Sequence, residues 1–238
     1  MQTQLHVLVS NSPRRSGGGF SLVELLAVIA IMAVLGAAVA PAFHSIGSAG
    51  KLSTGTAAVS SGLAIARNQA IATRRLTRFV VPSDWSDTPS ANFRKFSIWQ
   101  FEPDQGAAGA WVQVSKWENL PEGVVFDSSL SKTYMDAAPS LTNNPQAVQG
   151  PDAFQAGTAA NEDTFASGTS TFKGRYIEFS PRGGLRSVAS SQPVTWFTLV
   201  EGFIDGQDVR YTRGGSSPSN WRQISVGTLL GRATVYSP

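Results

Sequence analysis

Three patterns of apolar and polar positions follow one another along the chain. The first is a continuous apolar segment, Phe20–Phe43, in which no side chain between residues 25 and 40 is polar. Its 24 residues would form a helix about 36 Å long, and the hydrocarbon core of a bilayer is about 30 Å thick. Residues 20–43 are therefore predicted to be a transmembrane helix.

The second pattern has a helical period and covers residues 44–75. Its apolar residues recur at spacings of three, four and seven, which predicts an amphipathic continuation of the first helix; they are Leu52, Val59, Leu63, Ala66 and Ala70. Glycines from residue 47 onward each lower helix propensity by about 1 kcal/mol relative to alanine, so we expect an interruption around residues 47–55. Pro41 has no amide hydrogen and is expected to kink the helix where it leaves the membrane.

The third pattern alternates with a period of two and begins at residue 76. Alternation, β-branched and aromatic residues and intervening turn residues predict strands; the ranges are 76–81, 93–101, 111–117, the end of 120–126, 175–180, 194–201, 207–212, 222–226 and 232–236. Pro82 is expected to stop the first strand. These elements predict an antiparallel sheet or two-sheet sandwich packed on the helix, which is an α+β fold with a β-rich head over residues 76–238.

Residues 128–170 differ from the rest of the predicted head. Small and polar residues predominate there, so we expect an inserted loop region. Asn161, Glu162 and Asp163 offer oxygen ligands for calcium, but the alternating ligands of a calcium loop are absent. We therefore expect no metal site.

Composition argues against several kinds of site. The chain has no cysteine, which excludes disulfides and cysteine metal sites, and its two histidines are His6 and His44. Neither histidine lies in the predicted head, so catalysis by histidine is not expected. Nearby acids such as Asp205 and Asp208 have a spacing that is common in loops. We expect a protein without enzymatic activity and without a cofactor.

The charge distribution predicts the orientation in the membrane. Net charge is +3, and the first nineteen residues carry Arg14 and Arg15 without an acid, which leaves the rest of the chain nearly balanced. After these arginines no basic residue occurs before Lys51. Because positive charge favours the cytoplasmic side, the N-terminus is predicted to be cytoplasmic and the chain beyond the helix periplasmic or extracellular.

A glycine cluster at residues 17–19 separates the arginines from the apolar segment. A secretory signal peptide is cut after its apolar segment, whereas a cut at this cluster would keep that segment on the mature chain. Glu24 would then lie about 6 Å into the helix, where an acid costs less than the roughly 2.5–3.5 kcal/mol expected at the bilayer centre. Two interpretations are open: an interfacial acid with a solvated carboxylate, or a carboxylate that pairs in lipid with the new amino terminus of a neighbouring subunit.

The stretch Gly19–Leu26 resembles the start of type IV prepilins and type II secretion pseudopilins. The resemblance implies that residues 1–19 are a leader, which a prepilin peptidase removes by cutting after Gly19. It also implies methylation of the new terminus at Phe20 and assembly through Glu24. The mature chain would be a single-pass protein in the inner-membrane lipid, with a cytoplasmic N-terminus and a periplasmic head.

Four shorter stretches resemble minor pseudopilins of the GspH/FimT class; they are residues 62–71, 120–126, 177–184 and 224–235. This resemblance implies a long helix under a β-sandwich-like head near the tip of a pseudopilus or pilus-like filament. The implied partners are the prepilin peptidase and the other major and minor subunits. The expected function is that of a minor pseudopilin, a structural subunit of a type II secretion pseudopilus or type IV pilus-like filament.

A DNA-binding minor pilin for DNA uptake is the alternative function. Basic residues interleaved with aromatic ones can hold phosphates and stack bases. The last part of the chain provides such a set, with Arg210, Arg213, Arg222 and Arg232.

Basic residues also gather around the end of the predicted helix, with no acid between Glu24 and Asp84; they are Lys51, Arg67, Arg74, Arg75 and Arg78. We interpret them as a solvated helix face. A contact with an acidic partner or with DNA phosphates is the alternative.

Overall fold

The computed structural model describes residues 21–106, 108–127, 162–186, 194–206, 208–212, 218 and 220–237, and of residues 37–49 it describes the backbone alone. By its internal contacts the chain divides into two units, residues 1–44 and residues 45–238, and each is described by itself. The predicted leader and most of the predicted insertion, residues 128–161, lie outside the described residues.

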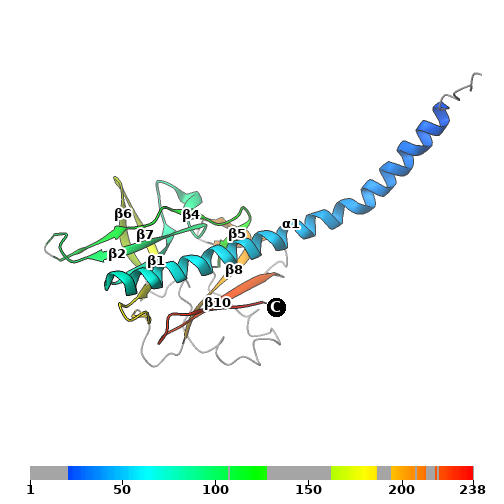
Figure 1. Ribbon diagram of the computed structural model, residues 1–238. Coiled ribbons are helices and arrows are strands. Elements are labelled where there is room, and N and C mark those ends of the chain that lie inside the picture. Colours follow the sequence, from blue (N-terminus) through cyan, green and yellow to red (C-terminus); the bar gives the residue numbers. More distant parts are fainter. Residues whose placement is uncertain are drawn as a thin grey trace, which may run out of the picture. The chain divides into compact units, whose positions relative to one another are not determined.

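One long helix, α1 (Leu22–Thr73), covers nearly all of the predicted transmembrane helix and of its predicted continuation (Figure 1). The helix runs through residues 47–55, so the expected interruption there is wrong. Within this stretch Leu52 and Gly55 are buried against the head, and tertiary packing outweighs propensity for most helices in proteins. The helix also continues through Pro41, and the kink at this residue stays a prediction.

In the described part of the head, two antiparallel sheets lie on either side of the last turns of α1 (Figure 1). Sheet 1 has six strands in the order β3-β2-β1-β7-β6, with β4 paired to β2; they are β1 (Thr77–Asp84), β2 (Lys95–Glu102), β3 (Ala110–Gln113), β4 (Glu118–Asn119), β6 (Glu162–Ser167) and β7 (Ser170–Phe179). Sheet 2 has five strands in the order β11-β10-β8-β5, with β9 paired to β8; they are β5 (Val124–Phe126), β8 (Val194–Asp205), β9 (Asp208–Tyr211), β10 (Trp221–Gly227) and β11 (Ala233–Tyr236). A short 3-10 helix, η1 (Pro89–Ala91), connects β1 to β2. The predicted α+β fold class is confirmed.

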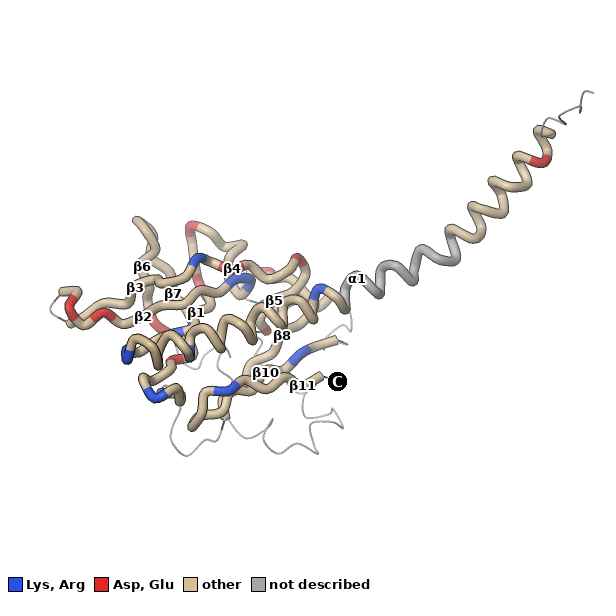
Figure 2. The backbone as a smooth tube through the Cα atoms, in the orientation of Figure 1, with Lys and Arg blue, Asp and Glu red and all other residues tan. Residues whose placement is uncertain are grey.

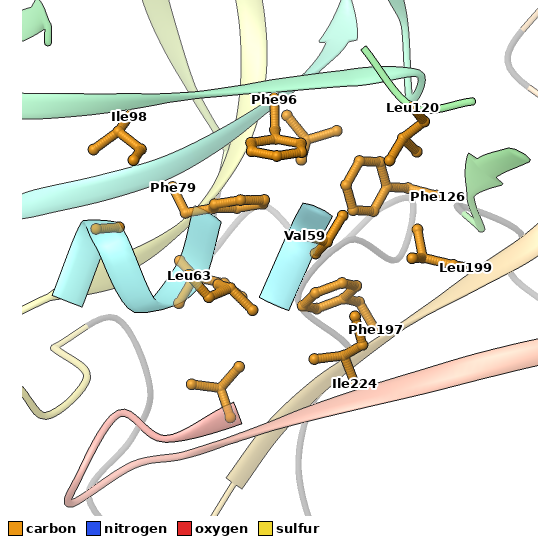
Figure 3. Close-up of a cluster of buried hydrophobic side chains, with 14 of the residues drawn as sticks. Val59, Leu63, Phe79, Phe96, Ile98, Leu120, Phe126, Phe197, Leu199 and Ile224 are labelled. Atoms are coloured by element: carbon orange, nitrogen blue, oxygen red, sulfur yellow. The ribbon is translucent and has the colours of Figure 1, made fainter. Parts of the chain in front are cut away.

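The core of the head lies where the two sheets enclose α1. The buried apolar side chains of α1 are those of the predicted stripe, from Leu52 to Ala70, and Thr56 is buried as well. Strand register aligns the inner rows of each sheet: Phe79 of β1 lies opposite Ile98 of β2, and Phe197 of β8 lies opposite Ile224 of β10. Figure 3 shows the first pair on one side of the helix and the second pair on the other. The helix therefore fills the space between the sheets.

A glycine lets α1 approach sheet 1 closely. Gly62 lies on the buried face of the helix, and a Cβ atom at this position would come within 2.5 Å of Phe96 Cε2 and 3.0 Å of Phe79 Cε2. These two rings are stacked, with their centroids 4.7 Å apart. The helix can rest on the stacked rings because Gly62 has no side chain. At Gly50, by contrast, a Cβ atom would meet nothing within 4 Å.

The end of α1 is fixed to β2. The helix ends at Thr73, and Arg74 adopts the left-handed conformation with φ 55°, which turns the chain towards β1. Gln69 Nε2 donates to Gln100 Oε1 (3.0 Å), and Arg75 forms an ion pair with Glu102. These contacts hold the end of the helix against β2.

Strand β1 continues through Pro82 to Asp84, so the expected stop at Pro82 is wrong. The carbonyl oxygen of Pro82 accepts a hydrogen bond from the amide of Phe93 (2.8 Å). Since the amide and carbonyl of one strand residue point to the same side, the missing amide hydrogen faces away from β7 and removes no bond from the β1–β7 ladder. Regular pairing of β1 with β2 has already ended at Val80.

Sheet 1 also takes in part of the predicted insertion. Residues 162–167 form β6 and residue 170 begins β7, so the loop expected over residues 128–170 is wrong for its last part. Most residues of β6 are polar, which explains why the sequence pattern gave no strand here. Its pairing with β7 places Phe165 opposite Phe172, and both rings are buried.

Gly62→Ala is expected to destabilise the head, and Gly50→Ala is expected to stabilise it. Both exchanges improve helix propensity, but the methyl group at residue 62 meets the stacked rings. We expect the free energy of unfolding to fall by about 1–2 kcal/mol for Gly62→Ala and to rise by up to about 1 kcal/mol for Gly50→Ala. Urea unfolding of the detergent-solubilised chain, followed by tryptophan fluorescence, measures both changes. Equal effects of the two exchanges would contradict the close contact at Gly62.

Candidate functional site

The first turns of α1 present a continuous apolar surface. Every described side chain from residue 21 to residue 36 is exposed. The large apolar ones among them have exposed fractions between 44% and 79%; they are Leu22, Val23, Leu25, Leu26, Val28, Ile29, Ile31, Met32, Val34 and Leu35. Their positions cover all sides of the helix, and a helix that is apolar all round is normally buried by other molecules or by lipid.

Glu24 is the exception on this surface and lies in the first turn of α1. It is exposed, and in the same turn the amide of Leu25 donates to the carbonyl oxygen of Ser21 (3.1 Å). In Figure 2 the described first part of α1 carries an acidic position near its start and no basic one. A carboxylate in the first turn is favoured by the helix dipole, by about 0.3–1 kcal/mol at an exposed site. Gly19 and Phe20, the predicted cleavage site, lie just outside the described residues.

The last part of the predicted transmembrane segment is described by its backbone alone, which is helical. Within the residues that the structure describes, no helix is at once long enough and apolar enough to cross a membrane. The membrane-spanning role of residues 20–43 stays a prediction.

The arginines predicted for DNA binding do not gather at one point of the described head. Arg210 of β9 is exposed and donates to Asp205 (3.2 Å). Arg222 lies at the start of β10, and Arg232 follows the turn at the far end of that strand. The length of the strand separates these two residues by about 17 Å. Arg213 lies outside the described residues, and DNA binding stays a prediction.

The acids considered as calcium ligands are next to arginines. Glu162 Oε2 lies 3.5 Å from Nε of Arg175, and Asp163 Oδ2 lies 2.7 Å from Nη1 of Arg78. Within the described ranges no group of three His, Cys, Asp or Glu side chains is placed to hold a metal ion. The described acids of β6 therefore take part in ion pairs of the head.

Arg78 forms a buried ion pair that was not predicted from the sequence. It lies on β1 and belongs to the basic residues interpreted above as a solvated helix face, and for this residue that interpretation is wrong. Its guanidinium donates to Glu178 Oε2 (2.8 Å) and to Asp163 Oδ2 (2.7 Å). It also stacks on Trp111 and Tyr176, at 3.8 Å and 3.7 Å from the ring centroids. The side chains of Arg78 and Glu178 are only 9% and 8% exposed.

Aromatic side chains extend this cluster over the outer face of sheet 1, where the buried rings include Trp99, Phe165 and Phe172. Nζ of Lys95 lies 4.2 Å from the ring centroid of Trp85, and burial lowers the pKa of Lys95. Burial raises the pKa of Tyr176 and outweighs the opposing effect of Arg78. The outer face of sheet 1 is therefore a second packed core, and its charges belong to the packing of the head.

Residues 14–40 match the family model of the prokaryotic N-terminal methylation motif. The matched range contains the two arginines, the glycine cluster, Glu24 and most of the apolar segment. The match supports a type IV pilin-like subunit, which implies processing by a prepilin peptidase and assembly with other pilins. Comparisons with curated proteins and with solved structures gave no match.

Arg78→Met is expected to lower the free energy of unfolding by about 3–5 kcal/mol, because it leaves the buried Glu178 carboxylate without its closest cation. Arg210→Met is the matched control, since Arg210 and Asp205 are 61% and 62% exposed. An exposed ion pair contributes at most about 1 kcal/mol. Urea unfolding of both variants measures the difference. A loss for Arg78→Met no larger than that for Arg210→Met would contradict the buried pair.

Proposed function

We propose that this chain is a minor pseudopilin, a structural subunit near the tip of a type II secretion pseudopilus or a related pilus-like filament. In this proposal a prepilin peptidase removes residues 1–19, and the helix that then begins at Phe20 packs beside the helices of major and other minor subunits. The motif match at residues 14–40 supports this processing and assembly. The α+β head, with the helix enclosed by two sheets, supports a pilin-like architecture.

The exposed apolar surface of residues 22–35 carries the proposal. Burying a large apolar side chain stabilises a complex by about 1.5–3 kcal/mol, so the surface as a whole represents a gross gain of tens of kcal/mol. None of these side chains is covered within the described chain. Lipid covers such a surface before assembly, and the helices of neighbouring subunits replace the lipid in a filament.

In this proposal Glu24 determines how the helices of neighbouring subunits align. Leucine, isoleucine and valine side chains pack in several alternative alignments, whereas a carboxylate in an apolar environment needs a cation or hydrogen-bond donors nearby. The amino group of Phe20, freed by cleavage, is such a cation, and on a neighbouring subunit it can reach Glu24 when the two helices are staggered correctly. Assembly is then coupled to leader removal, since an uncut chain has no amino group at this level.

The proposed location follows from the same segment. The chain would be a single-pass protein of the inner membrane, with the N-terminus in the cytoplasm and the head in the periplasm, because Arg14 and Arg15 precede the apolar segment. Placement near the filament tip rests on the resemblance of the head to the GspH/FimT class. We propose no enzymatic activity for this subunit.

Mass spectrometry of the chain purified from membranes is expected to find a mature protein that begins at Phe20 with a methylated amino group. The Gly19→Leu variant is expected to retain residues 1–19, because a bulky side chain replaces the glycine at the proposed cut. Intact leader on the wild-type chain, or a cut after residue 40, would contradict the proposal.

Glu24→Ala is expected to be inserted in the membrane and cut after Gly19 like the wild type, but to be lost from filaments. Losing one partner of a buried charge pair costs about 3–5 kcal/mol, which corresponds to at least about a hundredfold lower incorporation. Immunoblots of sheared filaments and of the membrane fraction measure incorporation and processing separately.

Glu24→Asp is the matched control, because it keeps the charge on a shorter side chain, and it is expected to assemble better than Glu24→Ala. Equal incorporation of Glu24→Ala and the wild type would show that a solvated interfacial acid, without pairing, describes Glu24 better.

A further inference from the structure

Three segments that are far apart in the sequence meet at one end of the head. They are the last turns of α1, the turn after β7 (residues 180–186) and the turn between β10 and β11 (residues 227–232). Arg67 Nε donates to the carbonyl oxygen of Leu230 (2.6 Å), and the amide of Leu185 donates to the carbonyl oxygen of Thr228 (2.7 Å). The β10–β11 turn is therefore bound both to the helix and to the β7 turn.

Glycines make the contact between the two turns very close. A Cβ atom on Gly184 would lie 2.6 Å from the carbonyl oxygen of Leu229, and one on Gly231 would collide with the carbonyl oxygen of Gly183. Gly231 also has a positive φ of 61° and donates its amide to the Gly227 carbonyl (2.8 Å). Backbone packed this closely has little freedom, so the position of the β10–β11 turn is fixed.

The β10–β11 turn exposes two leucine side chains to solvent. Leu229 is 87% exposed and Leu230 is 60% exposed. Ile71 of α1 is 40% exposed, and its Cδ1 atom lies 2.8 Å from where a Cβ of Gly183 would be. These three exposed side chains belong to segments that meet at one junction, and exposed apolar side chains that gather among polar residues mark interaction sites.

The rim of this surface is basic. Arg67 lies next to Leu230, Arg182 is exposed in the β7 turn, and Arg232 is exposed at the end of the β10–β11 turn. None of the three segments contains an acid: α1 has none after Glu24, and none occurs in residues 180–186 or 227–232. In Figure 2 the β10–β11 hairpin likewise shows basic and no acidic positions. A partner complementary in charge carries carboxylates around an apolar centre.

These features favour a protein partner over nucleic acid or lipid. Single-stranded nucleic acid is held by basic residues together with aromatic rings that stack on bases, and the exposed apolar residues here are aliphatic. A lipid surface adapts to any apolar side chain, whereas locked turns that present two leucines in a fixed geometry lower the entropic cost of binding to a shaped protein surface.

We propose that Leu229, Leu230 and Ile71, with the rim of Arg67, Arg182 and Arg232, form a docking surface for the head of a neighbouring filament subunit that presents an apolar depression bordered by carboxylates. This inference rests on the proposed function, because the partner is another subunit carrying an N-terminal methylation motif. It adds a contact between heads to the contact between helices.

The test uses the full chain in membranes of cells that assemble it, with the photo-cross-linker p-benzoylphenylalanine at residue 229. A cross-link to a subunit with an N-terminal methylation motif is expected, and the same probe at Val114, an exposed residue after β3, is the control position that should give none. Cross-links to lipid or nucleic acid alone, or no cross-link, would overturn the proposal.

A charge reversal tests the rim. Arg182→Glu is expected to lower the yield of the cross-link from residue 229 at least about tenfold, the effect of losing a single important interface contact. Arg210→Glu, an exposed exchange elsewhere in sheet 2, is expected to leave the yield unchanged. Equal yields for the two variants would overturn the basic rim as a determinant.

Failure of the docking surface and failure of the proposed function remain distinguishable. Leu229→Asp is expected to keep the melting temperature of the chain, because this side chain is 87% exposed, and to reduce incorporation into filaments. Wild-type incorporation of Leu229→Asp would overturn the docking surface alone. Absence of the wild-type chain from filaments would overturn the proposed function together with the docking surface.

Discussion

Burial of one face of α1 between two antiparallel sheets is the interaction that organises the described head. Each sheet has an inner row of phenylalanine and aliphatic side chains, and both rows end on the same helical stripe. The two sheets also contact each other directly in this core, since the ring of Phe79 of β1 lies edge-on to that of Phe126 of β5, with their centroids 6.4 Å apart. At Gly62 this packing leaves no room for a side chain, because the helix lies directly on two aromatic rings.

The two ends of this helix differ in the distribution of their apolar side chains. Its last turns have a polar side and a buried apolar side, as expected for a helix packed within a protein, whereas its first turns are apolar on every side. No side chain of the described residues covers these first turns. In the proposed assembly, burying the single carboxylate of this surface, that of Glu24, is costly unless a cation lies next to it, which suits Glu24 to select one alignment among many.

The sequence predicted those elements whose apolar spacing and residue types match the face that they bury. The stripe from Leu52 to Ala70 has a helical period, and the central strands β1, β2 and β8 are rich in β-branched and aromatic residues, so both are visible in the sequence. Strand β6 was missed because it is a polar edge strand, and Phe165 is its one buried residue. The signal that was available for this hairpin is Gly168, which lies between Phe165 and Phe172. The burial of Arg78 was missed because it depends on Glu178, a hundred positions away, being brought next to it by strand pairing.

Local signals also fail where long-range contacts decide. A proline ends a strand only when a neighbouring strand would bond to the amide hydrogen that proline lacks. At Pro82 the nitrogen faces away from β7, and only the fold shows this. At the candidate assembly segment the sequence pattern was sufficient to single out Glu24, since the apolar run, the acid and the glycine cluster are contiguous. The convergence of Arg67, Leu185 and Leu230 required the fold, because nothing in their separate turns indicates that they meet.

The order of the strands indicates where the chain can accept additional residues. Strand β5 ends sheet 2 at Phe126, and the next described strand, β6, joins the edge of sheet 1 at Glu162. The entropy of loop closure grows slowly with length, and closing a connection twice as long costs only about 0.6 kcal/mol more. Length added between these two edge strands is therefore expected to cost the described sheets little stability.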